Sequence, residues 1–134
     1  MDISFGKFVN YLVLLLHSNG INLLLHKQEA WHQLFYRLKR QQESVGKPIF
    51  LEELWFDWDK QYPTSPELSE YLNAMCVLGV VETNSPTFDR YWLSKDMEKL
   101  WQKQFDELNE EIKQYLRFTA QIAIEEFAKV VIQA

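Results

Sequence analysis

Two histidines and a glutamate, residue types that bind transition metals, stand three residues apart in one polar stretch. His26, Glu29 and His32 have this spacing, and Glu29 with His32 matches half of the motif found in di-iron helical bundles. Such bundles need a second motif, yet the chain has no histidine after His32. On a helix, the two histidines would also diverge by roughly 120°. We therefore expect no metal site here, and interpret the stretch as a partly solvated helix face.

The sequence also lacks the residue arrangements of other enzymes. It contains no Gly-rich phosphate loop and no Gly-x-Ser-x-Gly nucleophile elbow. Cys76 is the only cysteine and has apolar neighbours, which favours a buried, inert thiol in a reducing compartment. Paired acids such as Glu110-Glu111 point to different sides of a helix. We therefore expect a protein that is not an enzyme and uses no cofactor or metal.

Composition and charge limit the classes of fold and function that the chain can have. The 134 residues, 47 % hydrophobic and 25 % charged, are enough for one globular domain with its own core. The chain has only 4 Gly and 4 Pro, which favours helices over a loop-rich β-sandwich. The net charge of −5, from 14 basic and 19 acidic residues, counts against binding nucleic acid through charge alone but allows a local basic patch.

The amino-terminal apolar run is too short for a membrane span. Residues 8–16 are almost continuously apolar, but His17 and Ser18 end the run well short of the roughly 20 residues that a bilayer requires. Asp2 stands where a signal peptide carries positive charge. We expect a cytoplasmic protein that does not contact a membrane.

Two helices are predicted in the first third of the chain. Ser4 can cap a helix that runs to about His17 and ends at Asn19-Gly20. A second helix is predicted from about Asn22 to Glu43. Its expected inner face consists of Leu24, Trp31, Leu34, Phe35 and Leu38.

The next stretch has two interpretations. Residues 48–50 are predicted to be extended, because Pro48 disfavours helix before it and Ile and Phe favour strands. A helix is then preferred up to about Lys60, although alternation through Leu54, Phe56 and Trp58 also fits a strand. On the preferred helix Trp55 and Trp58 point into the core. An exposed aromatic binding surface is the alternative.

A helix and a hairpin follow. Ser65 as N-cap and Pro66 at the first helical position start a helix, which Gly79 ends. Strands at 80–82 and 90–93 flank turn residues and form a hairpin. The predicted apolar face of the helix consists of Leu68, Leu72, Met75 and Cys76.

The carboxyl-terminal segment from Ser94 is helical with no Gly or Pro after Lys95. Whether it forms one helix or two folded back on each other is left open. A second apolar face after Leu116 predicts two neighbours, the first helix and a second copy of the chain. Apolar residues at coiled-coil spacing predict a dimerisation seam, which consists of Trp101, Phe105, Leu108, Ile112, Tyr115, Thr119 and Ile122.

This order of elements resembles a winged helix-turn-helix domain, and the flanking helices resemble those of MarR-type regulators. The implied fold is mostly α with a small β-hairpin. It is a single domain over 1–134, with an amino-terminal helix at 1–20, a winged-helix core at 21–94 and a dimerising helical segment at 95–134. The residues that carry the resemblance are Ile49–Leu54, Ser65–Leu68, Leu72–Met75, Leu78–Glu82 and Arg90–Ser94.

The resemblance implies a DNA-binding transcriptional regulator that acts as a homodimer on double-stranded DNA. The helix from Ser65 would read the DNA, and Glu82 to Arg90 would form the wing. One departure from the family pattern is that no Lys or Arg lies between Pro63 and Asp89. The alternative is therefore a protein-interaction module on the same scaffold. Candidate DNA contacts are Ser65, Ser69, Asn73 and Arg90, with Arg37, Lys39 and Arg40 as a basic cluster.

Overall fold

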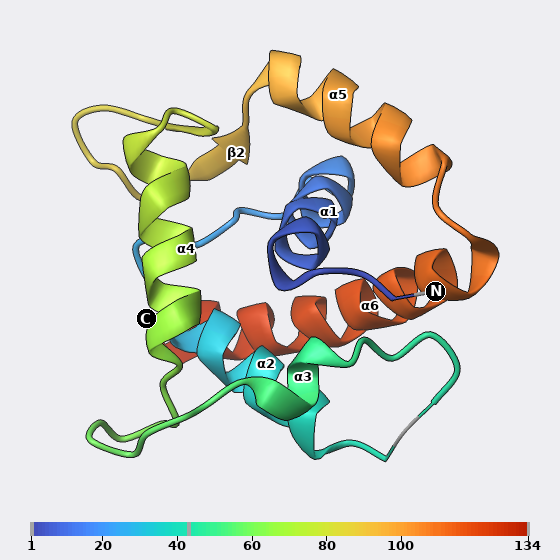
Figure 1. The fold of residues 1–134 in the computed structure, drawn as a ribbon. Helices are drawn as coiled ribbons and strands as arrows, with labels where there is room; N and C mark the ends of the chain where they lie inside the picture. The colour runs from blue at the N-terminus through green and yellow to red at the C-terminus, as the bar shows by residue number, and fades with distance from the viewer. Residues whose placement is uncertain (1, 43, 134) are drawn as a thin grey trace.

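The computed structural model describes residues 2–42 and 44–133, with side chains through Val131. It confirms the predicted fold class, because the described residues are mostly helical and carry one small antiparallel hairpin in winged-helix order (Figure 1). The helices are α1 (Phe5–Ser18), α2 (Glu29–Arg40), α3 (Phe50–Glu53), α4 (Pro66–Val77), α5 (Lys95–Asp106) and α6 (Glu110–Gln133). The strands are β1 (Val81–Thr83) and β2 (Tyr91–Leu93).

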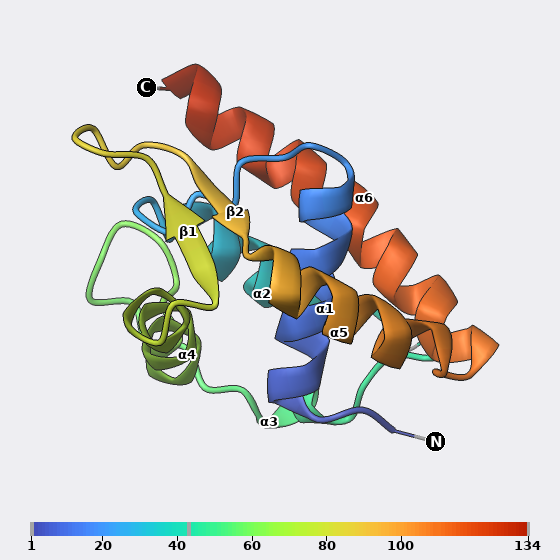
Figure 2. The same cartoon turned by 90° about the horizontal axis from the view of Figure 1, so that it is seen from above.

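Helix α1 lies in the middle of the molecule. It packs against α5, α6 and β2, while α4 lies to one side (Figures 1 and 2). Because its sequence is apolar on nearly every face, it can be surrounded in this way. None of the described helices is both long and apolar enough to cross a bilayer. The buried side chains of α1 are Phe8, Val9, Tyr11, Leu12, Val13, Leu14 and Leu16.

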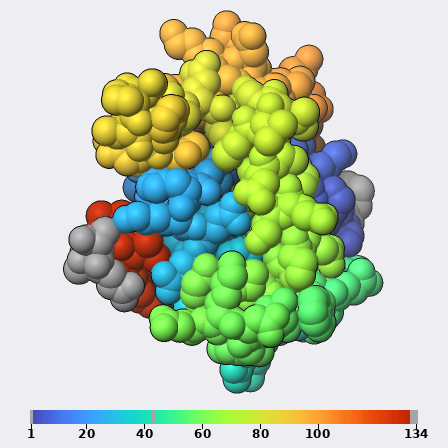
Figure 3. Space-filling view, turned by 90° about the vertical axis from the view of Figure 1, so that its left-hand side faces the viewer, coloured from blue at the N-terminus to red at the C-terminus, as the bar shows by residue number. Residues whose placement is uncertain are grey.

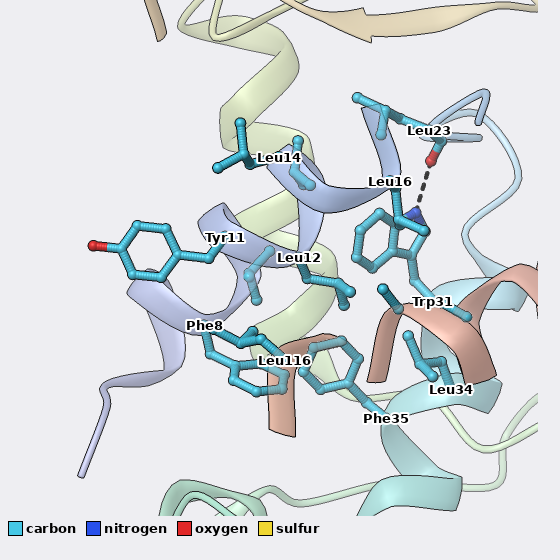
Figure 4. Close-up of a cluster of buried hydrophobic side chains, with 14 of the residues drawn as sticks. Phe8, Tyr11, Leu12, Leu14, Leu16, Leu23, Trp31, Leu34, Phe35 and Leu116 are labelled. Carbon is cyan, nitrogen blue, oxygen red and sulfur yellow. Dashed lines mark hydrogen bonds between the residues drawn. The ribbon is translucent and has the colours of Figure 1, made fainter. Parts of the chain in front are cut away.

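Helix α2 contributes large buried side chains that pack against α1 and α6 (Figure 4). Its Trp31 is fully buried and packs edge-to-face against Phe127 of α6, with ring centroids 5.3 Å apart. The indole N–H of Trp31 donates to the carbonyl oxygen of Leu23 at 2.8 Å, so this polar group is satisfied inside the core. On the same helix, Phe35 packs against Phe8 of α1 at 5.9 Å.

The predicted second helix begins later than expected, at Glu29 instead of Asn22. Residues 21–28 form an irregular segment whose backbone bonds elsewhere, since the N–H of Leu23 donates to the carbonyl of Tyr91 at 3.1 Å. A tertiary bond therefore replaces a helical bond at Leu23, and the N–H of Leu24 donates to the side chain of Asn22 at 3.2 Å. The helix ends at Arg40, and the predicted end at Glu43 lies outside the described residues.

Of the predictions for residues 48–60, the extended piece at 48–50 was wrong and the preferred helix forms only at its start. The alternative, extended interpretation agrees with the chain after Glu53. Ile49 has helical dihedral angles, and the helix that follows, α3, ends at Glu53. The chain is then extended, and Asp57 pairs with Thr64 through two backbone bonds of 2.9 and 3.0 Å. The Lys39 ammonium binds the carbonyls of Glu52 and Leu54, so partners outside the segment satisfy groups that a longer helix would have bonded internally.

The carboxyl-terminal segment consists of two helices. The break falls at residues 107–109, where Asn109 Oδ1 accepts the backbone N–H of Ile112 at 2.9 Å and caps α6. The second neighbour of α6 is α2 of the same chain, where a second copy was expected. The residues of the predicted dimer seam lie within one chain: Trp101, Phe105, Ile112, Tyr115, Thr119 and Ile122 are buried, and Leu108 is half-buried.

The helix caps agree with the sequence. The hydroxyls of Ser4, Ser65 and Ser94 accept backbone N–H groups of the first turns of α1, α4 and α5. After α1, Gly20 has a positive φ of 72°, and its N–H donates to the carbonyl of His17 at 2.9 Å. This geometry closes the helix end as predicted.

Two glycine substitutions separate backbone strain from steric clash. Gly20 and Gly46 both have positive φ (72° and 84°), but an added Cβ meets open space at Gly20 and collides with the Glu111 carbonyl at Gly46. Gly20→Ala should lower the free energy of unfolding by about 1 kcal/mol and Gly46→Ala by about 2–5 kcal/mol. Urea denaturation measures both, and equal losses would contradict the packing of the 44–47 loop against α6.

Candidate interaction surface on helix α4

The position of α4 is set by a buried histidine on α2. The backbone N–H of Ser65 donates to His32 Nδ1 at 3.1 Å, so the neutral ring carries its proton on Nε2. That nitrogen lies 3.1 Å from the hydroxyl oxygen of Ser69, one turn further along α4. His32 thus fixes the first turn of α4 with both ring nitrogens, and α4 cannot rotate without breaking these bonds.

His32 was expected on a partly solvated face, and this was wrong. Its side chain is buried, and burial, with a smaller effect from the Lys60 charge, lowers its pKa from 6.5 to about 4. The ring is therefore neutral near pH 7 and serves as a structural connection. Among the described residues, no group of three or more His, Cys, Asp and Glu side chains is placed to hold a metal ion.

The serines proposed to contact DNA face α2. Ser65 is fully buried as the N-cap, and Ser69 is half-buried against His32. Asn73 is exposed, and its Oδ1 accepts a hydrogen bond from the Gln28 amide at 2.8 Å. Arg90 is exposed immediately before β2. Of these four candidates, the structure leaves Asn73 and Arg90 open to an outside ligand.

Most of the predicted basic cluster is engaged within the chain. Arg37 forms ion pairs with Glu125 and Glu126 of α6 at 3.4 and 3.1 Å. Lys39 binds the two carbonyls at the end of α3 described above. The guanidinium of Arg40 lies over the Tyr36 ring at 5.7 Å, and this residue remains exposed. The cluster therefore stabilises the fold and presents less charge to solvent than its sequence suggests.

The outward side of α4 is acidic in its first half and apolar in its second. We define the outer face of α4 as the exposed residues Glu67, Glu70, Asn73, Ala74 and Val77. Val77 is 85 % exposed, and the following Leu78 is 76 % exposed. Exposure of this much apolar surface beside carboxylates is a feature of interaction sites.

Cys76 also lies on the exposed side, where burial had been expected. It follows the buried Met75 at the end of α4, beyond the last turn that the core covers. Partial desolvation by neighbouring atoms still raises the pKa of its thiol. The thiol is therefore accessible but mostly protonated near neutral pH.

The loop before α4 adds aromatic surface. Trp55 and Trp58 are 61 % and 60 % exposed, which overturns the prediction that both enter the core. The reason is that this segment is extended, so helical spacing does not apply to it. Phe56 is half-buried against Tyr36, with ring centroids 5.3 Å apart. In Figure 3 this loop and α4 form one continuous side of the molecule.

An apolar groove of about 250 Å³ lies along the second half of α4. Met97 and Trp101 of α5 form its opposite wall, and Asn10 of α1 contributes a polar group. The remaining lining residues are Tyr71, Ala74 and Met75 of α4 and Leu78 and Val80, which follow it. No local sequence pattern indicates this groove, because it depends on the distance between α4 and α5, which are separate in the sequence.

These features define a helix-rich, winged-helix-like protein whose α4 presents an acidic and apolar surface. Comparisons with family models, with curated proteins and with solved structures found no match for the chain.

The pKa of His32 predicts a pH dependence of stability. Because the folded-state pKa is below the unfolded value, the contribution is complete above pH 6.5 and is lost as the pH falls towards 4. The loss should reach about 3 kcal/mol. His32→Asn keeps an acceptor for the Ser65 N–H but does not titrate. The difference in unfolding free energy between the two proteins should therefore shrink from pH 7 to pH 4, and a constant difference would contradict this role.

Proposed function

We propose that the protein is a non-enzymatic protein-interaction module on a winged-helix-like scaffold, which holds a basic segment of a partner protein against the outer face of α4. The observation that carries the proposal is the composition of that face. Its exposed positions include Glu67 and Glu70 but no Lys or Arg. In the winged-helix order this helix would enter the DNA groove, where carboxylates would face phosphates.

The charges around α4 support a basic partner. Residues 54–80, which include α4 and the preceding loop, contain four acidic residues and one basic residue, Lys60. The exposed rings of Trp55 and Trp58 lie beside Asp57 and Asp59 in sequence. Aromatic faces and carboxylates both attract the cationic groups of Lys and Arg. A basic peptide segment is therefore complementary to this side of the molecule.

A peptide of ten lysines tests how much the carboxylates on α4 contribute to binding a basic segment. Glu67→Gln combined with Glu70→Gln should weaken its binding about fivefold, since each exposed charge contributes only a few tenths to 1 kcal/mol. Glu110→Gln combined with Glu111→Gln is the matched control, because it changes the net charge equally at the start of α6, away from α4 (Figure 1). Fluorescence anisotropy measures both affinities. Equal weakening by the two pairs would show that only net charge matters and would contradict the proposal.

Duplex DNA is the second candidate. The winged-helix order of elements and the exposed Arg90, Arg40 and Asn73 favour it. The homodimer that a two-fold operator requires would need surfaces other than the buried side chains of the predicted seam. The DNA hypothesis is therefore supported by the fold and opposed by the charge on α4.

A salt series with random duplex DNA decides between the candidates. We expect no measurable binding even at low salt, because the acidic face repels phosphates. Binding that falls steeply with added salt and is weakened by Arg90→Gln would instead support DNA. Electrophoretic mobility or anisotropy at several salt concentrations provides the measurement.

A further inference from the structure

The apolar groove beside α4 has a rigid wall before any partner binds. The Tyr71 hydroxyl donates to Asn10 Oδ1 at 2.6 Å and lies 3.1 Å from the Gly6 carbonyl oxygen. Its ring also packs edge-to-face against Phe5 at 5.5 Å. Tyr71 is thus fixed to α1 from two sides, so an incoming side chain would meet a preformed surface and lose little affinity to reorganisation.

The rim of the groove is also apolar. Leu78, which directly follows α4, lines the groove, and Leu100, the neighbour of the lining residue Trp101 in the sequence of α5, is 47 % exposed. Val77 extends this surface outward on α4. Large apolar side chains on both helices are therefore available to cover a helix lying between them, and burying them would favour association.

The negative charges beside the groove indicate that its occupant is basic. Glu67 and Glu70 precede the lining residues Tyr71 and Ala74 by four positions, so each lies one turn away on the same side of α4. A segment that places apolar side chains in the groove therefore lies close to two carboxylates. Lys or Arg beside its apolar stripe would complement them.

We infer that the groove between α4 and α5 holds an amphipathic helix of a partner protein. Apolar side chains four residues apart enter the groove, and basic side chains on the same helix lie against Glu67 and Glu70. The inference rests on the proposed function and adds the shape of the partner segment and its apolar anchors to that function.

Two peptides made of the same number of leucines and lysines test the inference. In the first, leucines recur at helical spacing, and in the second, leucine and lysine alternate, which favours a strand. The helical peptide should bind at least tenfold more tightly. Ala74→Trp, which fills the groove from an exposed position, should remove this preference. Ala128→Trp, at an exposed position of α6, should leave it unchanged.

Leu78→Ser provides a second variant, because an exposed residue can be replaced with little effect on folding. It should also reduce binding of the helical peptide several-fold. Equal affinities for the two peptides, or unchanged binding by both groove variants, would overturn the groove inference. The proposed function fails separately, if the substitutions at Glu67 and Glu70 weaken neither peptide more than those at Glu110 and Glu111.

Discussion

The pair of hydrogen bonds at the His32 ring decides which side of α4 faces solvent. The ring accepts the Ser65 N–H and contacts the Ser69 hydroxyl, so these two polar residues turn inward and the carboxylates turn outward. On the adjacent position of α2, Trp31 makes the connection to α6 and to the 21–28 segment. Helix α2 therefore links the core to the helix that carries the candidate surface. A neutral, buried histidine suits this task, since it offers two directional bonds without the cost of burying a charge.

Buried and half-buried polar groups need hydrogen-bond partners, and this requirement also determines where the basic side chains lie. Lys39 donates to backbone carbonyls at the end of α3, Lys47 donates to a carbonyl just after α2, and Arg37 forms ion pairs with α6. Irregular segments leave carbonyls without helical or strand partners, and long cationic side chains can satisfy them. Arg37 and Lys39, which belong to a basic cluster in the sequence, thereby connect α2 to α6 and to the end of α3. The exposed surface around α4 is left acidic and aromatic, which is unfavourable for phosphates and favourable for a basic polypeptide.

Local chemistry made the ends of α1 and α4 and the hairpin predictable. Ser65 followed by Pro66, and the glycines after α1 and α4, act through bonds within a few residues. The wrong predictions share a different cause. The spacing of apolar residues indicates that they are buried, but it does not indicate which segment covers them. Trp55 and Trp58 satisfy a helical pattern, yet Lys39 and the Asp57–Thr64 pairing hold their segment extended and leave both rings more than half exposed. The predicted dimer seam marks truly buried residues, but α1 and α2 of the same chain cover much of it. The groove and the role of His32 depend on contacts between distant segments, so neither has a local signal.

Cys76 offers the most direct test of which macromolecule meets α4. It is the only cysteine, and it is exposed at the end of that helix, so a nitroxide label attached to it reports on whatever approaches the outer face. Paramagnetic broadening of ligand NMR signals should be strong for a basic amphipathic peptide and absent for a DNA duplex at the same concentration. Broadening of the duplex signals with none for the peptide would mean that α4 contacts nucleic acid, and the central claim would be wrong.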